Sequence, residues 1–262
     1  MDFETIIYEK LDRKAIITLN RPDRMNAMNT KMSEELFQAW TDFRDDPEVW
    51  VAIMTGTGDR AFSAGADLKD TAESRKQGAR SFPMSTVPVG GNTKNVHIWK
   101  PMIAAINGYA LGGGLEMALT CDIRIAAEHA RLGLPEVRWS LMAAAGGVTR
   151  LPRSVPRAVA MKMVLTGEPI TAQEALQWGL VTDVVPLAEL MPTAHRIADR
   201  ILENAPLAVQ AAKEMVMRGL DLSLDASLAT ETDYVMPLRH TEDFREGPRA
   251  FAEKRKPKFK GR

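Results

Sequence analysis

The chain has 262 residues, of which 45% are hydrophobic and 26% charged, and its 34 lysine and arginine residues balance 34 aspartate and glutamate residues. This composition supports a packed core rather than disorder, and a net charge of zero argues against general nucleic-acid binding. The chain has a single cysteine, no uncharged run long enough to span a membrane and no apolar signal segment at its start, so we expect a soluble cytoplasmic protein.

The first half of the chain alternates segments typical of strands and helices. Residues 15–19 are rich in β-branched side chains and precede an Asn-Arg-Pro turn, which predicts a strand. Asn29 or Thr30 can cap a helix that runs to about Phe43 with apolar residues on one face. Residues 49–55 are almost entirely apolar, as expected for a strand that is covered on both faces.

A second set of strand, turn and helix begins at residue 102. Between the two sets we expect a loop, a polar helix and a further loop with two prolines, at residues 56–67, 68–79 and 81–91. Then come a predicted strand, glycine-rich turn, helix and strand, at residues 102–106, 107–114, 115–121 and 122–127. Strand–turn–helix units that recur about 50 residues apart indicate an α/β body with crossover connections.

The chain from Arg157 onward is mainly helical in pattern. Segments with helical spacing and Pro or Gly at their ends lie at residues 158–165, 171–179, 187–204 and 207–218. A strand pair is expected near residues 181–185. No low-complexity linker interrupts the sequence, so we predict one α/β body with a helical C-terminal region.

Two glycine-rich segments each follow a predicted buried strand. They are residues 62–69 (FSAGADLK) and 107–116 (NGYALGGGLE). Small residues let the backbone approach a ligand closely, and a helix that starts after residues 112–114 leaves its first N–H groups unpaired. Two such segments facing each other would form an oxyanion hole. Glycines that only permit tight strand-to-helix turns would give the same pattern, so both interpretations remain open.

The familiar nucleotide and metal motifs do not occur. The glycines at 112–114 fail the Gly-x-Gly-x-x-Gly pattern because Met117 takes its last position, and there is no Gly-x-x-x-x-Gly-Lys-Ser/Thr sequence. The four histidines, at positions 97, 129, 195 and 240, are scattered, and the cysteine has no partner. We therefore expect no metal site.

Two glutamates stand out by position. Glu116 lies in an apolar helical segment that should be buried, and Glu136 follows a predicted strand twenty residues later. Two carboxylates that share an apolar pocket raise the pKa of one of them, which supplies a proton donor and an acceptor near neutral pH. Alternatively, Glu116 forms a buried ion pair with an arginine, and Glu136 is a charge at the N-terminus of a helix.

These motifs together resemble the crotonase (enoyl-CoA hydratase/isomerase) family. Residues 101–122 resemble its central signature, residues 61–69 its first oxyanion loop, and residues 131–136 with Gly146 and Gly147 its second carboxylate segment. Shorter similarities to the family lie at residues 20–22, 26–28 and 251–255. The resemblance covers nearly the whole chain in the family's order.

The resemblance implies a fold and an assembly. It predicts an α/β spiral of ββα turns over residues 1–200, followed by a helical trimerisation region over residues 201–262 that also contacts CoA. The expected assembly is a homotrimer or a dimer of trimers.

The resemblance also implies a reaction. The backbone N–H groups of Ala66 and Gly113 would hold the carbonyl oxygen of an acyl-CoA thioester, while Glu116 and Glu136 move protons. Because both carboxylates are present, hydration of an enoyl-CoA or dehydration of a 3-hydroxyacyl-CoA is favoured. Enoyl-CoA isomerisation, acyl-CoA hydrolysis and a noncatalytic binding role are the alternatives.

Further positions follow from the same resemblance. CoA, as part of the substrate and not a tightly bound cofactor, would contact Ala64, Ala66, Asp67, Leu68, Lys69, Gly113 and Arg24. It would also contact Phe251 and Lys254, from the same chain or from a neighbouring subunit. Six of the last nine residues are lysine or arginine, which is also typical of a solvated tail.

One position departs from the family's pattern. Ala144 stands where hydratases of the family usually have glycine, which suggests an acyl pocket of different shape. Met84, Trp139 and Met142 are candidates to line that pocket, although core packing is the expected role of each.

Overall fold

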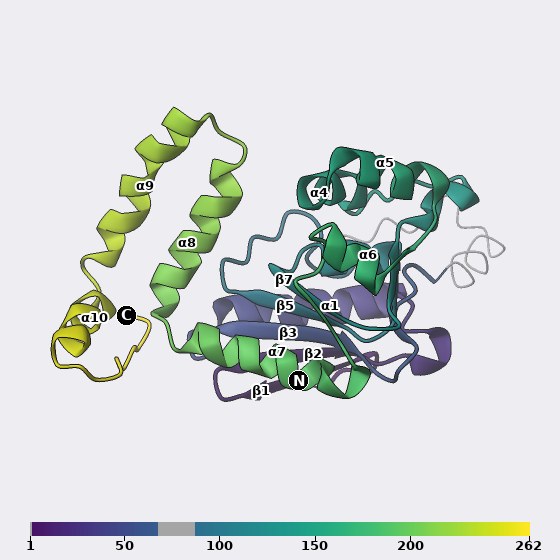
Figure 1. Cartoon of the computed structure of the whole chain (residues 1–262). Coiled ribbons are helices and arrows are strands. Elements are labelled where there is room, and N and C mark those ends of the chain that lie inside the picture. The colour runs from purple at the N-terminus through teal and green to yellow at the C-terminus, as the bar shows by residue number, and fades with distance from the viewer. Residues whose placement is uncertain (1, 68–86) are drawn as a thin grey trace.

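The computed structural model describes residues 2–67 and 87–262. The predicted helix over residues 68–79 and most of the predicted loop over 81–91 lie outside these ranges. An α/β body occupies one side of the molecule, and a helical arm projects from it (Figure 1). None of the helices in the described ranges is long and apolar enough to cross a membrane.

The larger of the two sheets in the described structure has six strands. Its order is β1 (Ile6–Leu11), β2 (Lys14–Leu19), β3 (Val51–Gly56), β5 (Met102–Ile106), β7 (Ile123–Ala127) and β10 (Asp183–Val185). The first two strands form an antiparallel hairpin, and the other neighbours are parallel. The predicted strand pair near residues 181–185 is therefore wrong, because a single strand there pairs with β7.

The smaller sheet has four strands, in the order β4 (Ala61–Ser63), β6 (Tyr109–Leu111), β8 (Arg131–Gly133) and β9 (Ile170–Thr171). Along the chain, β3 is followed by β4, β5 by β6, and β7 by β8, so each pair gives one strand to each sheet. This repetition is the predicted spiral. Because β6 lies between β4 and β8 in parallel register, the carboxyl ends of these three strands meet.

Helices cover both faces of the six-stranded sheet (Figure 1). On one face, α1 (Thr30–Asp45) begins where Asn29 accepts a hydrogen bond from the Met32 N–H, and it buries the predicted apolar stripe. On the other face, α7 (Leu187–Leu202) packs Leu190, Ala194 and Ala198 against the sheet. The apolar run at residues 49–55 is buried for this reason, as predicted.

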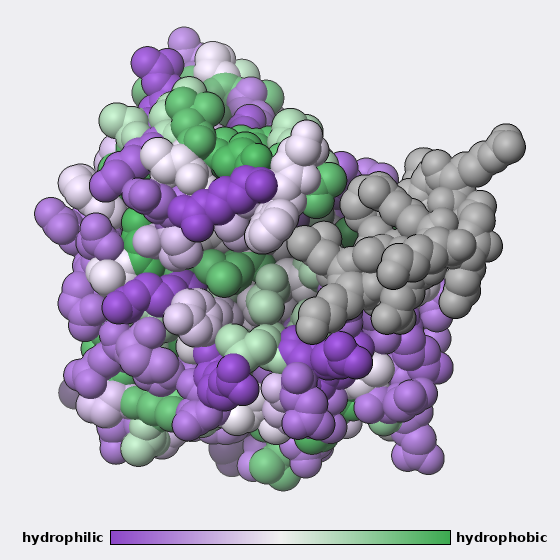
Figure 2. Space-filling model, turned by 90° about the vertical axis from the view of Figure 1, so that its right-hand side faces the viewer, coloured by the Kyte–Doolittle hydropathy of each residue, from purple (hydrophilic) through white to green (hydrophobic). Residues whose placement is uncertain are grey.

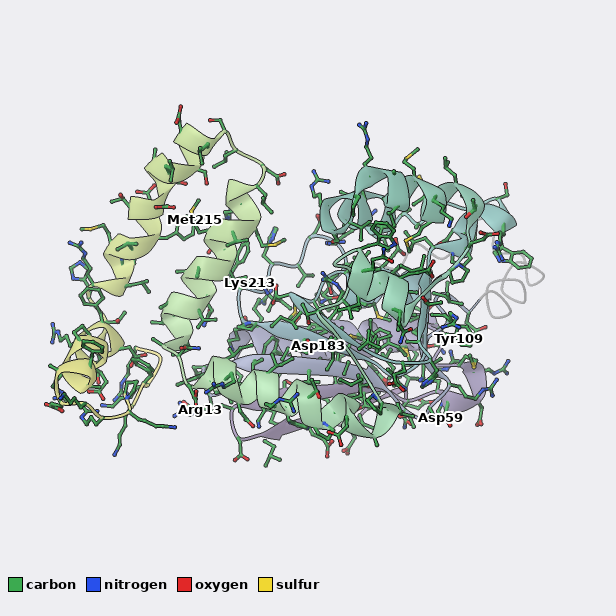
Figure 3. The ribbon with its side chains drawn as sticks, in the orientation of Figure 1. Arg13, Asp59, Tyr109, Asp183, Lys213 and Met215 are labelled. Carbon is green, nitrogen blue, oxygen red and sulfur yellow. The ribbon has the colours of Figure 1, made fainter. Side chains whose placement is uncertain are left out.

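The remaining helices complete the body and form the arm. In the body they are α3 (Gly113–Ala118), α4 (Gly147–Ser154), α5 (Arg157–Thr166) and α6 (Ala172–Gln177), with short 3₁₀ turns η1 (Pro22–Arg24) and η2 (Pro135–Trp139). In the arm they are α8 (Pro206–Gly219), α9 (Leu224–Leu238) and α10 (Glu242–Ala252). Helices α8 and α9 form a hairpin, and Met215 of α8 points toward α9 (Figure 3).

The arm is attached to the body at its base. The ammonium of Lys213 on α8 donates to the carbonyl oxygen of Lys100 at 2.9 Å and pairs with Asp122 at 2.8 Å. The predicted boundary between residues 200 and 201 falls in the last turn of α7, and the division into two regions stays a prediction.

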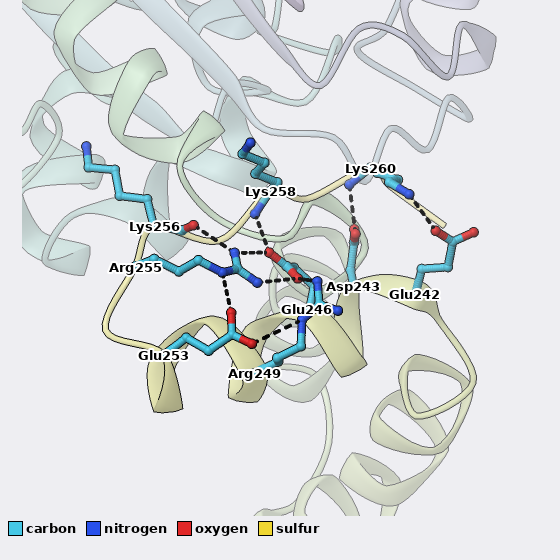
Figure 4. A network of polar contacts seen from close by, with 9 residues as sticks. All are labelled: Glu242, Asp243, Glu246, Arg249, Glu253, Arg255, Lys256, Lys258 and Lys260. Atoms are coloured by element: carbon cyan, nitrogen blue, oxygen red, sulfur yellow. Dashed lines mark hydrogen bonds and ion pairs between the residues drawn. The ribbon is translucent and has the colours of Figure 1, made fainter.

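The basic C-terminal segment is not a solvated tail. Backbone N–H groups of Lys260 and Gly261 donate to the buried carboxylate of Asp243 at 2.7 and 2.8 Å, and Arg255 pairs with Glu246 at 2.5 Å (Figure 4). The charge count pointed to solvent because the acidic residues that bind this segment lie on α10, earlier in the chain.

Asn107, in the turn between β5 and β6, is bound to the segment between β3 and β4, and we predict a large loss of stability on its replacement. Its buried amide accepts from the N–H of Gly56 at 3.1 Å and donates to the carbonyl oxygens of Gly56, Gly58 and Ala61 at 2.9, 2.7 and 3.2 Å. Asn107→Ala removes these four hydrogen bonds, although the carbonyl oxygen of Ala61 still accepts from Asn26 at 2.8 Å, so the free energy of unfolding should fall by about 3 kcal/mol in urea titrations. The control is exposed Gln173, whose replacement by Ala should change it by less than about 0.5 kcal/mol. An equal effect of both substitutions would contradict this role.

Candidate active site

The two glycine-rich segments lie against each other. Strands β4 and β6 are parallel neighbours, so the loops that follow them leave the sheet at the same edge. A Cβ atom placed on Gly65 would lie only 2.7 Å from the carbonyl oxygen of Leu111 and 3.1 Å from the nitrogen of Gly113. Gly65 also has a φ of +89°, which side chains rarely adopt, so glycine is needed here for two reasons.

The backbone amides of Ala66 and Gly113 are left for a ligand. Met28 donates its N–H to the carbonyl oxygen of Gly65 and accepts from the N–H of Asp67, both at 2.8 Å. This parallel bridge turns the N–H of Ala66 away from Met28. Gly113 is the first residue of α3, where an N–H has no partner within the helix. Within the described ranges neither amide donates a hydrogen bond.

A cleft of about 660 Å³ opens at this point, a volume typical of ligand sites. It is lined by both oxyanion segments, both candidate glutamates and residues of two other segments, namely Ala64, Gly65, Ala66, Val89, Thr93, Lys94, Gly112, Gly113, Glu116, Pro135, Glu136, Trp139, Ser140, Leu141, Met142, Ala144 and Ala145. On the face of the molecule that Figure 2 shows, hydrophobic residues gather between hydrophilic ones. The structure therefore brings the four predicted catalytic groups into one cavity.

Glu116 is a buried carboxylate held by the backbone. It lies on α3 with 4% of its surface exposed, and Oε1 accepts a hydrogen bond from the N–H of Gly147 at 2.8 Å. Burial raises the pKa of Glu116, while the backbone N–H groups of Gly147 and Ala145 and the charge of Arg150 act in the opposite direction. A direct pair with an arginine is not what holds this carboxylate, since Arg150 contributes at longer range.

Glu136 is a second carboxyl with a different environment. It lies on η2, and its Oε2 atom is buried without a hydrogen-bond partner in the described part of the chain. Burial raises the pKa of Glu136 to about 7, and the nearby charge of Glu116 adds to the effect. A Cβ on Gly112 would lie 3.0 Å from Oε1, so glycine at 112 permits this approach. Near neutral pH the pair thus has one ready proton donor.

The prediction of core packing is wrong for Trp139 and Met142. They are 66% and 63% exposed and line the cleft together with Ala144. Helix η2 ends at Ser140 in the left-handed region, which turns the following residues back toward the cavity. Apolar composition alone could not show this turn. Met84 lies outside the described residues.

The predicted CoA contacts fall into three groups: residues of the first oxyanion loop and the segment beside it, residues outside the described ranges, and residues of the arm. Ala64 lines the cleft, and its N–H donates to the carbonyl oxygen of Met25, which follows the exposed Arg24. Asp67 pairs with Arg21 at 3.2 Å. Leu68 and Lys69 lie outside the described residues.

The third group lies on the arm. Phe251 is 86% exposed near the end of α10, and Lys254 follows that helix. Helix α10 is on the other side of the molecule from α4 and α5, which adjoin α3 and η2 at the cleft (Figure 1). Within one chain these two residues do not reach the cavity, so their predicted contact with CoA requires a second subunit.

Sequence reasoning did not predict the roles of several residues of the site. Met28, which orients the first oxyanion loop, and Gly147, which holds Glu116, come from segments far from the loops they support. Lys94 lines the cleft from a polar loop that carries no motif. Over the described ranges no group of three or more His, Cys, Asp or Glu side chains is placed to hold a metal ion.

Comparison with known proteins gives a consistent result. The family model described as enoyl-CoA hydratase/isomerase matches residues 12–262. The (E)-benzylidenesuccinyl-CoA hydratase of Thauera aromatica is 43% identical over 256 residues, covering 98% of this chain and 99% of that protein. Carnitinyl-CoA dehydratase of Escherichia coli O157:H7 is 43% identical over 250 residues, covering 94% of each.

Solved structures agree over the full length. The enoyl-CoA hydratase of Mycobacterium tuberculosis H37Rv superposes with a TM-score of 0.90 at 37% identity, covering 98% of this chain and 99% of that one. The enoyl-CoA hydratase of Bacillus anthracis gives a TM-score of 0.89 at 40% identity, covering 99% and 100%.

Proposed function

The chain belongs to the enoyl-CoA hydratase/isomerase family, and on this basis we propose that it is a hydro-lyase acting on CoA thioesters. It adds water to the double bond of an enoyl-CoA or removes water from a 3-hydroxyacyl-CoA. The observation that supports this most strongly is the meeting, in one cleft, of two carboxyl groups and two backbone amides that have no hydrogen-bond acceptor among residues 2–67 and 87–262. The two curated relatives are named for different acyl groups, so identity alone does not define the acyl chain.

The proposed oxyanion hole stabilises an enolate. The N–H groups of Ala66 and Gly113 donate to the thioester carbonyl oxygen, whose negative charge grows as the double bond is attacked. Donors that are fixed before the reaction favour the transition state over the ground state, by several kcal/mol in comparable sites. Neither amide has to break a hydrogen bond to a described residue to do so.

The two carboxyl groups share one proton in the proposed reaction. In hydration, ionised Glu116 orients a water molecule toward the β-carbon and accepts its proton as the carbon–oxygen bond forms. Protonated Glu136 then gives its proton to the α-carbon, which takes up the electron pair of the enolate. Dehydration follows the same steps backwards, from protonated Glu116 and ionised Glu136.

The pH dependence follows from this shared proton. Both directions require the pair to hold one proton, and the pKa of Glu136 lies near 7. Above that pH the pair becomes doubly ionised, so kcat/KM for hydration should fall with rising pH through about 7, and kcat/KM for dehydration should fall in parallel. Initial rates between about pH 5 and pH 9 measure this. A kcat/KM that rises across this range would contradict the assignment.

A direct assay separates the alternatives. Hydration removes the absorbance of the conjugated enoyl thioester without releasing a thiol, whereas hydrolysis releases free CoA. An isomerase moves the double bond and needs only one carboxylate, so retention of both glutamates in the cleft favours water addition. Release of CoA with no hydrated product would replace the proposed function by that of a hydrolase.

The exposed side chains of the arm support assembly into a homotrimer or a dimer of trimers. The hairpin of α8 and α9 exposes apolar side chains that include Val216, Leu220, Leu224 and Leu228. A large exposed apolar surface usually marks an interface. A neighbouring arm would also bring Phe251 and Lys254 to the CoA of another subunit, which neither can reach in its own chain.

Replacing Leu220 and Leu224 together by Asp should dissociate the assembly. They are 74% and 73% exposed, so the double substitution should leave the monomer folded while placing charge in the interface. Light scattering after size exclusion should show trimer or hexamer for the wild type and a smaller species for the variant. The matched control, exposed Leu11→Asp on the body, should keep the wild-type mass. A monomeric wild type would contradict the proposal.

A further inference from the structure

We propose that the acyl group of the substrate ends in a carboxylate and that Lys94 binds this group. The inference rests on the proposed function, because it concerns the acyl side of the same cleft. It assigns a substrate class, namely enoyl or 3-hydroxyacyl monothioesters of dicarboxylic acids.

Lys94 is the cation among the described residues of the cleft lining. In that part of the chain, the charged groups that line the cavity are Glu116, Glu136 and Lys94. The two acids are occupied in the proposed reaction, and within the described ranges no acid forms an ion pair with the exposed Lys94. A positive charge on the wall of a cavity, with no ion-pair partner among the described residues, favours a ligand that carries the opposite charge.

The loop that carries Lys94 is firmly held. The hydroxyl of the neighbouring Thr93 donates to the carbonyl oxygen of Val89 at 2.6 Å. The carbonyl oxygen of Thr93 accepts from the guanidinium of Arg150 at 2.8 Å. The amide of Asn92 donates to Thr120 on the segment after α3 at 3.0 Å. The backbone of this loop is therefore fixed to the helix that carries Glu116 and to α4.

Lys94 lies on the acyl side of the cleft. Lys94 lines the same cavity as Glu116, the carboxylate that acts on the acyl carbons. The same Arg150 that binds Thr93 also donates to the carbonyl oxygen of Ala145 at 3.4 Å, in the segment that holds Glu116. The proposed CoA contacts Ala64 and Arg24 belong to the opposite oxyanion loop and the segment beside it.

The remaining lining residues favour an acyl chain that is apolar in its middle. Val89, Leu141, Met142 and Trp139 offer apolar side chains between the carboxyl pair and the solvent. A cationic acyl end would meet the charge of Lys94, and among the described lining residues Trp139 is the only aromatic side chain, too few for an aromatic cage. The cleft therefore fits an acyl chain that is apolar in its middle and negative at its end.

The test compares substrates that differ only in end charge. Glutaconyl-CoA, a 2-enoyl thioester that ends in a carboxylate, is compared with its methyl ester and with the corresponding trimethylammonium compound. The wild type should hydrate the carboxylate with a kcat/KM at least about tenfold above that of the ester, and the cation should be the poorest substrate. Most of the difference should be in KM, since Lys94 holds the end of the chain and not the reacting carbons.

Variants of Lys94 should change this ratio. In Lys94→Met the ratio of carboxylate to ester should fall to about one, and in Lys94→Arg it should be largely retained because the charge remains. Lys162→Met, which removes an exposed lysine on α5, is the matched control and should keep the wild-type ratio. An equal loss for both substrates in Lys94→Met would place Lys94 on CoA and overturn the proposal, as would a wild type without preference for the carboxylate.

A binding measurement separates this inference from the proposed reaction. Glutaryl-CoA and its monomethyl ester lack the double bond, so calorimetry reports their affinities whether or not the enzyme hydrates anything. Tighter binding of the carboxylate by the wild type but not by Lys94→Met supports the inference even if no enoyl-CoA is hydrated. Equal affinities overturn it even if hydration is observed.

Discussion

Glu136→Gln should lower kcat for hydration by about a thousandfold or more while the affinity for the CoA thioester stays close to that of the wild type. Glutamine keeps the size of the side chain but has no acidic proton for the α-carbon. General acid–base groups contribute about 10²- to 10⁴-fold to rates, and this carboxyl, with its pKa near 7, is tuned for that role. The neutral amide of glutamine also avoids placing a negative charge where the Oε2 atom of Glu136 is buried without a partner among the described residues. The folded structure should therefore persist.

Glu116→Gln should have an effect of similar size, because water would then lack its base. The double variant should lose little more than either single variant, since the two groups act as one unit. Single-turnover kinetics with an enoyl-CoA, together with binding of a saturated thioester, separate chemistry from affinity. Exposed Glu128→Gln, outside the cleft, is the control and should retain wild-type kinetics. Full activity of both Glu116→Gln and Glu136→Gln would refute the mechanism.

Ala66→Pro should lower kcat by about 10²- to 10³-fold, the usual loss when one oxyanion donor is removed. Proline has no N–H, and the amide of Ala66 forms none of the hydrogen bonds that fix the described part of the loop. The bridge through Met28 uses the carbonyl oxygen of Gly65 and the N–H of Asp67, so it can remain.

Ala66→Ser keeps the N–H on the same exposed position and serves as the matched control. It should retain activity within about tenfold of the wild type, because the donor is unchanged. Thermal unfolding and circular dichroism of both variants check that the fold is intact. A folded Ala66→Pro enzyme with the kcat of the control would mean that this amide does not hold the thioester oxygen.

Long periodic segments were predictable from the sequence. The helix after Asn29 and the buried strand near residue 51 depend on local spacing and burial, which a single sequence displays. Strands β4 and β6 were missed because each has only three residues, and their pairing joins segments nearly 50 residues apart. The spiral therefore came from resemblance, not from local pattern.

The catalytic residues of the candidate site were predictable from the sequence, but the residues that position them were not. Glu116 attracted notice because a charge in an apolar helical turn needs a task or a partner, and the cleft contains it. Gly147, Met28 and Lys94 carry no such local signal. Each reaches the site through contacts between distant segments, which only the folded chain reveals.

The central claim is that the amides of Ala66 and Gly113 hold the thioester oxygen while the two glutamates face the neighbouring carbons. A crystal structure with a bound 3-hydroxyacyl-CoA tests it most directly. The thioester oxygen should lie about 2.7 to 3.1 Å from both nitrogens, with Glu136 nearest the α-carbon and Glu116 nearest the β-hydroxyl. A thioester oxygen bonded elsewhere, with either glutamate turned away from the acyl chain, would contradict the account.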